Sequence, residues 1–303
     1  MISFSLLGSP TYGRLGNQLF QIAATIAIAK KNNHDFVFPT WDYNKYFEHV
    51  LPVGENVYAE KYFQKHKYFY EINLEKGNFD LRGFFSSAAF FEYAEADVRY
   101  YLTPKKEIIN ELKSKYVHLF SKKTCSIHIR RGDFLKFKLQ YPLISDYFYE
   151  TAMAHFDKDT VFVVFSDDIN YCKSKFRGDK FVFIENEKDI VDMFLMSMCD
   201  NHIISNSTFS WWGAWLNQKD SKKIIAPKQW FGPGHAIQYK KISKEITKDF
   251  MTIQSNKQYN RIGAFVVYIQ YHLKFFLLYK VKNIVPKHIR EVLKARIIKS
   301  PFR

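Results

Sequence analysis

Residues 124–130 read Thr124-Cys125-Ser126-Ile127-His128-Ile129-Arg130, and apolar and polar side chains alternate along them. A period of two residues is typical of a β-strand. Four further short runs rich in β-branched and aromatic residues follow, separated by stretches of helical length; they cover residues 161–166, 181–184, 202–205 and 223–226. Strands that alternate with helices predict a parallel sheet, because parallel neighbours need a crossover connection. We therefore expect the second half of the chain to form a doubly wound α/β domain.

The first half begins in a similar order. A strand is expected over residues 2–7, a glycine turn follows it, and residues 17–31 are expected to form a helix with one apolar face. Further strands are expected near residues 36–38 and over residues 79–84. These elements predict a second α/β unit.

The length of 303 residues suits two α/β domains of ordinary size. Polar residues on either side of residue 118 favour a boundary there, so we expect Rossmann-like domains over 1–118 and 119–256. The net charge is +15, but residues 257–303 alone contain 11 Lys/Arg and one acidic residue. The strong basicity therefore belongs to a C-terminal tail, and it does not indicate the chemistry of the body.

The three cysteines are an odd number, widely spaced, in apolar or helical surroundings: Cys125, Cys172 and Cys199. We interpret them as reduced core residues rather than a disulfide framework or a metal site. The first residues have no basic segment, and their apolar run is short for a signal peptide or membrane span. This favours a cytoplasmic enzyme.

Ligands of open α/β sheets bind beyond the carboxyl ends of the strands, so the residues that end each strand are the first candidates for a site. Alternation places His128 and Arg130 on the same side of the first of these strands. A guanidinium at a strand end suits bidentate binding of phosphate oxygens. The alternative for Arg130 is a structural ion pair with an aspartate of the loop.

Small polar residues join the strand ending at Ser205 to an aromatic helix; they are Asn206, Ser207 and Thr208. The free N–H groups of a helix start, together with hydroxyl side chains, form an anion site. The alternative is capping alone. The aromatic residues of the helix are expected in the core: Trp211, Trp212 and Trp215.

The strand over residues 161–166 ends in two carboxylates, Asp167 and Asp168. One of them could accept hydrogen bonds from a guanine edge or a ribose. A divalent metal is a further alternative, as is capping of the next helix. Near the N-terminus, residues 13–18 resemble a nucleotide-binding turn without the G-x-G-x-x-G spacing, and a turn with an Asn17 cap is the alternative there.

Taken together, the order of these segments resembles the α-1,2-fucosyltransferases of glycosyltransferase family 11. The resemblance rests on three motifs: Gly13-Arg14-Leu15-Gly16-Asn17-Gln18-Leu19-Phe20-Gln21, His128-Ile129-Arg130-Arg131-Gly132-Asp133, and Ile204-Ser205-Asn206-Ser207-Thr208-Phe209-Ser210-Trp211-Trp212 followed by Ala226-Pro227-Lys228-Gln229-Trp230. It covers most of residues 12–231. Residues 8–12 depart from the usual opening as an insertion, which leaves acceptor choice open.

This resemblance implies a GT-B fold with two Rossmann-like domains facing a cleft, the first on the acceptor side and the second holding GDP-fucose. It implies metal-independent transfer with inversion, with no cofactor. Arg130 is implied to contact the β-phosphate, while His128 and Asp167 lie near the nucleoside and Ser205–Ser207 near the diphosphate. The other expected donor-binding residues are Arg131, Thr208, Gly13, Arg14, Gly16, Asn17 and Gln18.

The catalytic base is left open by the sequence. Asp133 is a candidate for deprotonating the acceptor hydroxyl, and a structural Arg131–Asp133 pair is the alternative. A fixed guanidinium stabilises the charge that grows on GDP as the glycosidic bond breaks. Arg130, as this guanidinium, and Asp133, as the candidate base, are therefore the expected catalytic residues.

The tail, residues 261–303, mixes aromatic, aliphatic and basic residues. This composition favours an amphipathic helix on an anionic membrane surface, over a packed terminal helix or nucleic-acid contact. We therefore expect transfer of fucose to a galactoside-containing glycan of a surface polysaccharide, on the cytoplasmic face of the inner membrane, without nucleic acid. The alternatives are another GDP-sugar or linkage, and a non-catalytic basic membrane-binding module.

Overall fold

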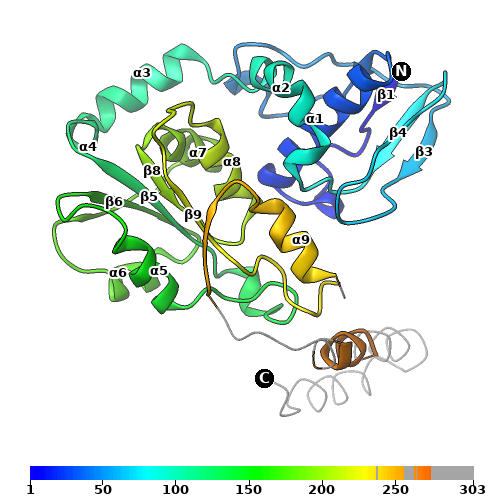
Figure 1. The fold of residues 1–303 in the computed structure, drawn as a ribbon. Helices are drawn as coiled ribbons and strands as arrows, with labels where there is room; N and C mark the ends of the chain where they lie inside the picture. Colours follow the sequence, from blue (N-terminus) through cyan, green and yellow to red (C-terminus); the bar gives the residue numbers. More distant parts are fainter. Residues whose placement is uncertain (237, 256–262, 264, 274–303) are drawn as a thin grey trace, which may run out of the picture.

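A computed structural model describes residues 1–236, 238–255, 263 and 265–273 (Figure 1). It is a mixed α/β structure with two parallel sheets. The first sheet has the order β2-β1-β4-β3, and every neighbouring pair is parallel. Its strands are β1 (Ile2–Ser3), β2 (Phe36–Val37), β3 (Glu60–Phe63) and β4 (Phe79–Arg82).

The second sheet has the order β10-β9-β8-β5-β6-β7, and it is parallel throughout. The expectation of βαβ units is therefore confirmed. Its strands are β5 (Thr124–Ile129), β6 (Val161–Ser166), β7 (Phe181–Phe183), β8 (Asn201–Ile203), β9 (Ile224–Pro227) and β10 (Met251–Ile253). β5 is buried along its whole length, as a central strand must be.

Helices cover both faces of this second sheet (Figure 1). α5 (Asp146–Met153) and α6 (Ile169–Lys175) pack on one face, in a core with Cys125 and Cys172. α7 (Asp189–Met198) and α8 (Thr208–Leu216) pack on the other face, toward α1 (Leu15–Lys31) of the first half. α9 (Tyr239–Ile246) precedes β10. The remaining helices are α2 (Glu95–Tyr101), α3 (Lys106–Lys115) and α4 (Val117–Phe120), with short 3-10 turns η1 (Pro10–Tyr12), η2 (Asn44–Tyr46), η3 (Ala88–Phe90), η4 (Glu92–Ala94) and η5 (Asp133–Leu135).

The two halves share an apolar core where α1 meets α8. The ring of Phe20 on α1 lies 4.8 Å from Trp211 and 5.0 Å from Trp212, and Trp212 also stacks on Phe91. The prediction that the tryptophans of this helix are core residues is confirmed for Trp211 and Trp212, which are almost fully buried. The cysteines are also buried and free, as expected.

Several element boundaries differ from the expectation. The first strand ends at Ser3 rather than residue 7, because the chain turns there and Ser5 donates its N–H to the Asp80 carboxylate. The first helix begins at Leu15, so Asn17 lies inside it and does not cap it. β4 ends at Arg82, before Gly83, and β8 ends at Ile203.

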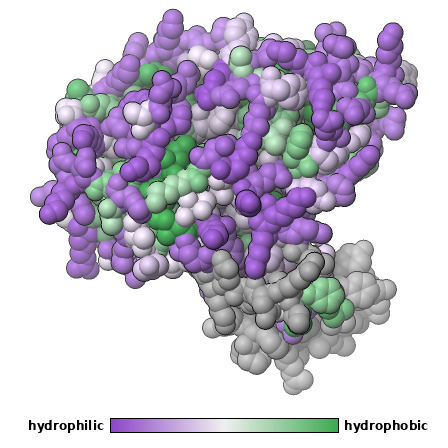
Figure 2. Space-filling view, viewed as in Figure 1, coloured by the Kyte–Doolittle hydropathy of each residue, from purple (hydrophilic) through white to green (hydrophobic). Residues whose placement is uncertain are grey.

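Most of the tail lies outside the described residues, so the predicted amphipathic helix over 261–303 is described only in part. Residues 265–273 are helical. Phe265, Val266, Ile269 and Leu273 expose between 38% and 54% of their surface. Figure 2 shows a mostly hydrophilic face of the body and apolar atoms on the described piece of this helix. Within the described part of the chain, no helix is long and apolar enough to cross a membrane.

Candidate active site

A cleft of about 530 Å³ lies between the two halves, at the carboxyl edge of the second sheet. The first half contributes the turn at residues 13–17 and residues of the segment 64–86, among them Lys67. The second half contributes the residues that follow β5, β6, β7, β8 and β9. The cleft therefore lies where the sequence analysis expected a ligand site, beyond the carboxyl ends of the strands.

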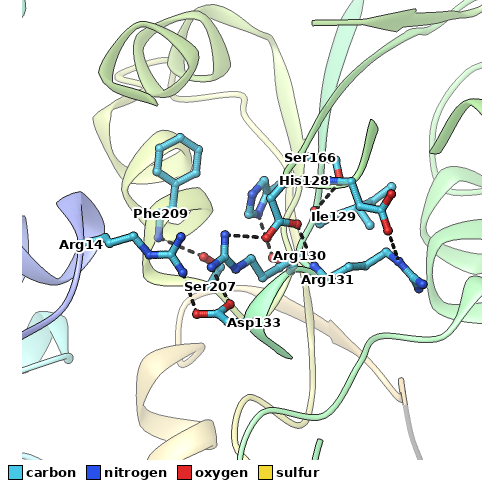
Figure 3. A network of polar contacts seen from close by, with 12 residues as sticks. Arg14, His128, Ile129, Arg130, Arg131, Asp133, Ser166, Ser207 and Phe209 are labelled. Carbon is cyan, nitrogen blue, oxygen red and sulfur yellow. Dashed lines mark hydrogen bonds and ion pairs between the residues drawn. The ribbon is translucent and has the colours of Figure 1, made fainter. Parts of the chain in front are cut away.

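Arg130 follows directly after β5, and its side chain is 14% exposed. One guanidinium nitrogen, Nη1, lies 2.7 Å from an oxygen of Asp167, and Nη2 lies 2.6 Å from Asp133 (Figure 3). The guanidinium also lies 5.5 Å from the centre of the Phe134 ring. Two carboxylates and a ring therefore fix this cation at the cleft.

Asp133 joins two arginines from different halves of the chain. Its second oxygen accepts a hydrogen bond of 2.6 Å from Arg14, whose side chain is 69% exposed (Figure 3). Arg131 points the other way, toward Asp168 at 3.0 Å, and lies over the Tyr171 ring. The alternative of an Arg131–Asp133 pair is therefore wrong, and a structural Arg–Asp pair exists at Arg130 instead. Arg131 lies outside the cleft lining.

The start of α8 forms the opposite wall. Ser207 caps the helix by accepting a hydrogen bond from the Phe209 N–H, as predicted. The Thr208 hydroxyl donates to Asn17 of α1 at 2.9 Å, so the two helix starts are joined across the cleft. Ser205 is fully buried behind them, where it bonds to His128 at 2.8 Å.

His128 and Arg130 both line the cleft. Burial, and then the charge of Arg130, lower the pKa of His128 to about 3. The ring is therefore neutral at pH 7, and it brings no positive charge of its own beside Arg130.

The turn at residues 13–18 holds the first half against α8. Gly13 has φ +93°, a conformation that favours glycine. A side chain at Gly16 would place its Cβ 2.5 Å from the Phe209 nitrogen, so the backbones of α1 and α8 touch there. Gln18 is not among the residues that line the cleft; its side chain donates to the Gly13 carbonyl at 3.3 Å and accepts a hydrogen bond from Trp41 at 2.8 Å. Gln18 therefore holds the Gly13 turn from within α1.

The carboxylates after β6 have separate tasks. Asp167 lines the cleft, accepts the Arg131 backbone N–H and pairs with Arg130. Asp168 caps α6, which was one of the alternatives. Among the described residues, no group of three or more His, Cys, Asp or Glu side chains is placed to hold a metal ion.

Asp192 was not predicted from the sequence. It lies in the first turn of α7 and lines the cleft, and its Oδ1 is buried with no hydrogen-bond partner in the described part of the chain. Burial, then the nearby charges of Glu187 and Asp189, raise its pKa to about 7. In the sequence it is one acid within an amphipathic helix, and nothing there distinguishes it from a solvated charge.

A group of four aromatic rings in the cleft was also not predicted from the sequence. Phe134, Tyr141, Phe231 and His235 line the cleft beyond Arg130, and their rings contact one another. They come from two loops, so their sequence spacing shows no period. The sequence gives no signal that would bring them together.

Known proteins resemble this chain closely enough to assign its family. The glycosyl transferase family 11 model matches residues 10–248. An O-antigen biosynthesis glycosyltransferase, WbnK, from Escherichia coli is 39% identical over 134 residues, which cover 38% of this chain and 43% of that protein. An α-1,2-colitosyltransferase from Escherichia coli is 30% identical over 269 residues, with 72% and 90% covered.

The similarity extends to animal proteins. The human galactoside α-(1,2)-fucosyltransferase 1 is 27% identical over 237 residues, which cover 69% of this chain and 64% of that protein. The resemblance drawn from the three motifs therefore agrees with matches over much longer stretches. The chain belongs to glycosyl transferase family 11.

Proposed function

We propose that this chain transfers L-fucose from GDP-β-L-fucose to a galactoside hydroxyl, in an α-1,2 linkage, with inversion and without a metal. The observation that carries the proposal is Arg130, held at the cleft by two carboxylates and facing the start of α8. A guanidinium beside a helix N-terminus is suited to a diphosphate. In this proposal the two sheets are the two halves of a GT-B enzyme.

The order of the strands suggests how the donor lies. From β7 to β9 the sheet edge spans four strand spacings, or roughly 19 Å. Acidic Asp192 lies after β7, the cation Arg130 after β5, and the aromatic rings Phe231 and His235 after β9. In a nucleoside diphosphate sugar the base, the diphosphate anion and the sugar follow one another in the same order.

At the β7 end, the buried Oδ1 of Asp192 lacks a donor among the described residues. A guanine edge presents the N1–H and N2–H₂ donors side by side, so it would satisfy such a carboxylate. Asp167 is already bound to Arg130 and to the Arg131 N–H, so it fits this role less well.

In the transfer itself, the acceptor oxygen forms a bond to the anomeric carbon while the bond from that carbon to the β-phosphate oxygen breaks. GDP leaves with the electron pair, and Arg130 stabilises the negative charge that develops. The acceptor proton passes to a base. Asp133 is the candidate, since it lies next to Arg130, and one oxygen would be released when phosphate takes over a guanidinium.

A donor panel tests this function. Purified chain is incubated with GDP-fucose, GDP-mannose or UDP-galactose and a β-galactoside, with and without EDTA, and the product is analysed by NMR for linkage. Transfer from GDP-fucose to the 2-hydroxyl, unchanged by EDTA, supports the proposal. Transfer only from another donor, or loss of activity with EDTA, contradicts it.

One comparison favours a second candidate donor. The α-1,2-colitosyltransferase matches over 90% of its own length, so a colitosyl donor belongs in the same panel. A higher kcat/KM for that donor than for GDP-fucose would change the assigned sugar but not the proposed role of Arg130.

We also propose that the enzyme acts in surface-polysaccharide assembly at the cytoplasmic face of the membrane, held there by its tail. The charge of residues 257–303 and the exposed apolar side chains of residues 265–273 support this location.

A further inference from the structure

Four rings form a continuous wall at the β9 end of the cleft; they are Phe134, Tyr141, Phe231 and His235. Phe134 stacks on Tyr141 at 4.9 Å, and Phe231 stacks on His235 at 4.0 Å with an interplanar angle of 7°. Tyr141 links the two pairs, because its ring lies 5.9 Å from Phe231 and 5.6 Å from His235. We call this group the aromatic wall.

The wall is built on two loops that are bound together. The N–H of Gly232 donates to the Gln140 carbonyl at 2.8 Å, and the N–H of Gly234 donates to Leu139 at 2.9 Å. A Cβ at Gly232 would lie 2.2 Å from the Leu139 oxygen, so only glycine permits this approach. The rings therefore stand on a fixed backbone rather than on two independent loops.

Asn206 also joins the same two loops. Its Nδ2 donates to the Pro142 carbonyl and to the Trp230 carbonyl, both at 3.0 Å. Its amide nitrogen is therefore engaged by the protein, while its Oδ1 has no hydrogen-bond partner among the described residues, and Asn206 also lines the cleft. Through its Nδ2, Asn206 holds together the two loops that carry the wall.

The wall begins where a sugar would leave the diphosphate. Phe134 lies under the Arg130 guanidinium at 5.5 Å, so the nearest ring adjoins the expected phosphate site. Burial, and then the Lys67 charge, lower the pKa of His235 to about 3, so its ring is neutral at pH 7. Phe134, Tyr141 and His235 are each partly exposed, while Phe231 is buried behind His235.

We propose that the aromatic wall binds the apolar face of a pyranose ring, either that of the donor sugar or that of the acceptor sugar. One face of such a ring carries C–H groups, and these lose contact with water when they pack on aromatic rings. This inference rests on the proposed function. It adds the surface that would hold the sugar in transfer position.

The test removes single rings from the full-length chain. Y141A and H235A each delete one ring of the wall, and Y141F keeps the ring without its hydroxyl. Y58A is the matched control, because Tyr58 is 98% exposed and lies outside the cleft lining. Calorimetry gives the affinities for GDP and GDP-fucose, and steady-state kinetics gives KM for donor and for acceptor. Thermal melting shows whether each variant is folded.

We expect Y141A and H235A to raise one sugar-dependent constant by about tenfold, the size of a lost ring contact. The affinity for GDP alone should stay within twofold, and Y141F should lie closer to wild type than Y141A. A weaker affinity for GDP-fucose identifies the donor sugar as the ring that stacks, and a higher KM for the galactoside identifies the acceptor.

Folded Y141A and H235A variants with unchanged constants for both sugars would overturn the proposal. So would an equal loss of GDP affinity, which would mean that the wall supports the phosphate site. Failure of the proposed function has a different result, because the wild-type chain would then bind no GDP or transfer no fucose.

Discussion

Arg130 is held at the cleft by carboxylates on two different loops, one after β5 and one after β6. Asp133 and Asp167 neutralise Arg130, and Asp133 also holds Arg14 from the other half of the chain. Two guanidinium groups converge on this one carboxylate, so in the proposed function the phosphates of the donor would replace Asp133 without moving the arginines far.

Replacing Arg130 tests this arrangement. R130A should lower kcat by about a thousandfold, by analogy with arginines that stabilise transferred phosphoryl groups, because the leaving diphosphate then develops its charge without a guanidinium. The kcat of R130K should lie between those of the wild type and R130A, since an ammonium keeps the charge but cannot bind in a bidentate way. Steady-state kinetics measures both. R177A, in an exposed loop, is the control. A loss below tenfold in R130A would contradict the assignment.

Asp192 gives a pH-dependent prediction. Its pKa of about 7 means that the carboxyl is largely protonated below pH 7, and a protonated acid cannot accept both guanine donors. GDP affinity of the wild type should therefore fall as pH decreases from 7.5 to 5.5, by up to about tenfold per pH unit. D192N should bind GDP more weakly at pH 7.5 and lose most of this dependence.

D192N should weaken GDP binding but increase the stability of the fold. The pKa of the Asp192 carboxyl is higher in the folded chain, at about 7, than the ordinary value of 3.8 expected in the unfolded chain. The contribution of this group to the free energy of unfolding is therefore fully present below pH 3.8 and is lost as pH rises through 7. D192N removes the buried charge, and its melting temperature at pH 8 should rise by a few degrees. A lower melting temperature together with unchanged GDP affinity would contradict both parts.

At the scale of elements, the cleft depends on how α1 and α8 meet. Phe20 packs against Trp211 and Trp212, the Thr208 hydroxyl bonds to Asn17, and Gly16 lies against the backbone of Phe209. The helix starts are thus fixed by apolar packing behind them and by a polar contact in front. Their separation sets the width of the cleft at this point.

Gly16→Ala should disturb that separation. The added Cβ would lie 2.5 Å from the Phe209 nitrogen and 2.6 Å from the Thr208 carbonyl carbon, and neither backbone atom can rotate away. We expect destabilisation by about 1–3 kcal/mol and a clear loss of kcat. Gly54→Ala is the matched control, since its nearest neighbour is a Val37 methyl at 3.5 Å. Urea unfolding and kinetics measure the two effects, and equal results for both variants would contradict the role of Gly16.

Elements were predictable from the sequence where one pattern dominated. β5 and β6 lie within a residue of the expected runs, because buried parallel strands are short and rich in β-branched or aromatic residues. The first strand is shorter than the expected run of residues 2–7, because the turn after Ser3 depends on Asp80, 77 residues away. Long-range partners of this kind leave no local signal.

At the scale of the whole molecule, the sequence predicted which strand ends line the cleft but not how the strands are ordered in space. Arg130 and Asp167 could be proposed because they follow apolar strands, and His128 because alternation places it on the same side of its strand as Arg130. Asp192 and the aromatic wall become visible only when the strand order brings residues after β7, β5 and β9 to one edge. Strand order follows from crossover connections that no local pattern encodes.

The tail provides the last test at this scale. Residues 257–303 carry 11 basic residues and one acidic residue, and the described helix exposes Phe265, Ile269 and Leu273. We expect the full chain to sediment with vesicles that contain anionic lipid and to dissociate as salt rises, because screening weakens the attraction of each cation. F265D/I269D should bind vesicles several-fold more weakly, whereas F63D, which replaces another exposed phenylalanine, should bind as wild type does.

Truncation after residue 256 separates attachment from catalysis. The family match ends at residue 248, and Ile242 is the last of the described residues that line the cleft. Turnover of GDP-fucose on a soluble galactoside should therefore persist within about twofold while vesicle binding is lost. Tyr271 has a contact of its own and lies near enough to Tyr141 for that residue's charge to raise its pKa, after burial, to about 12. If the truncated chain is folded but turns over slowly, the tail supports the aromatic wall rather than membrane attachment alone, and a truncated chain that still binds anionic vesicles would place the membrane contact on the body.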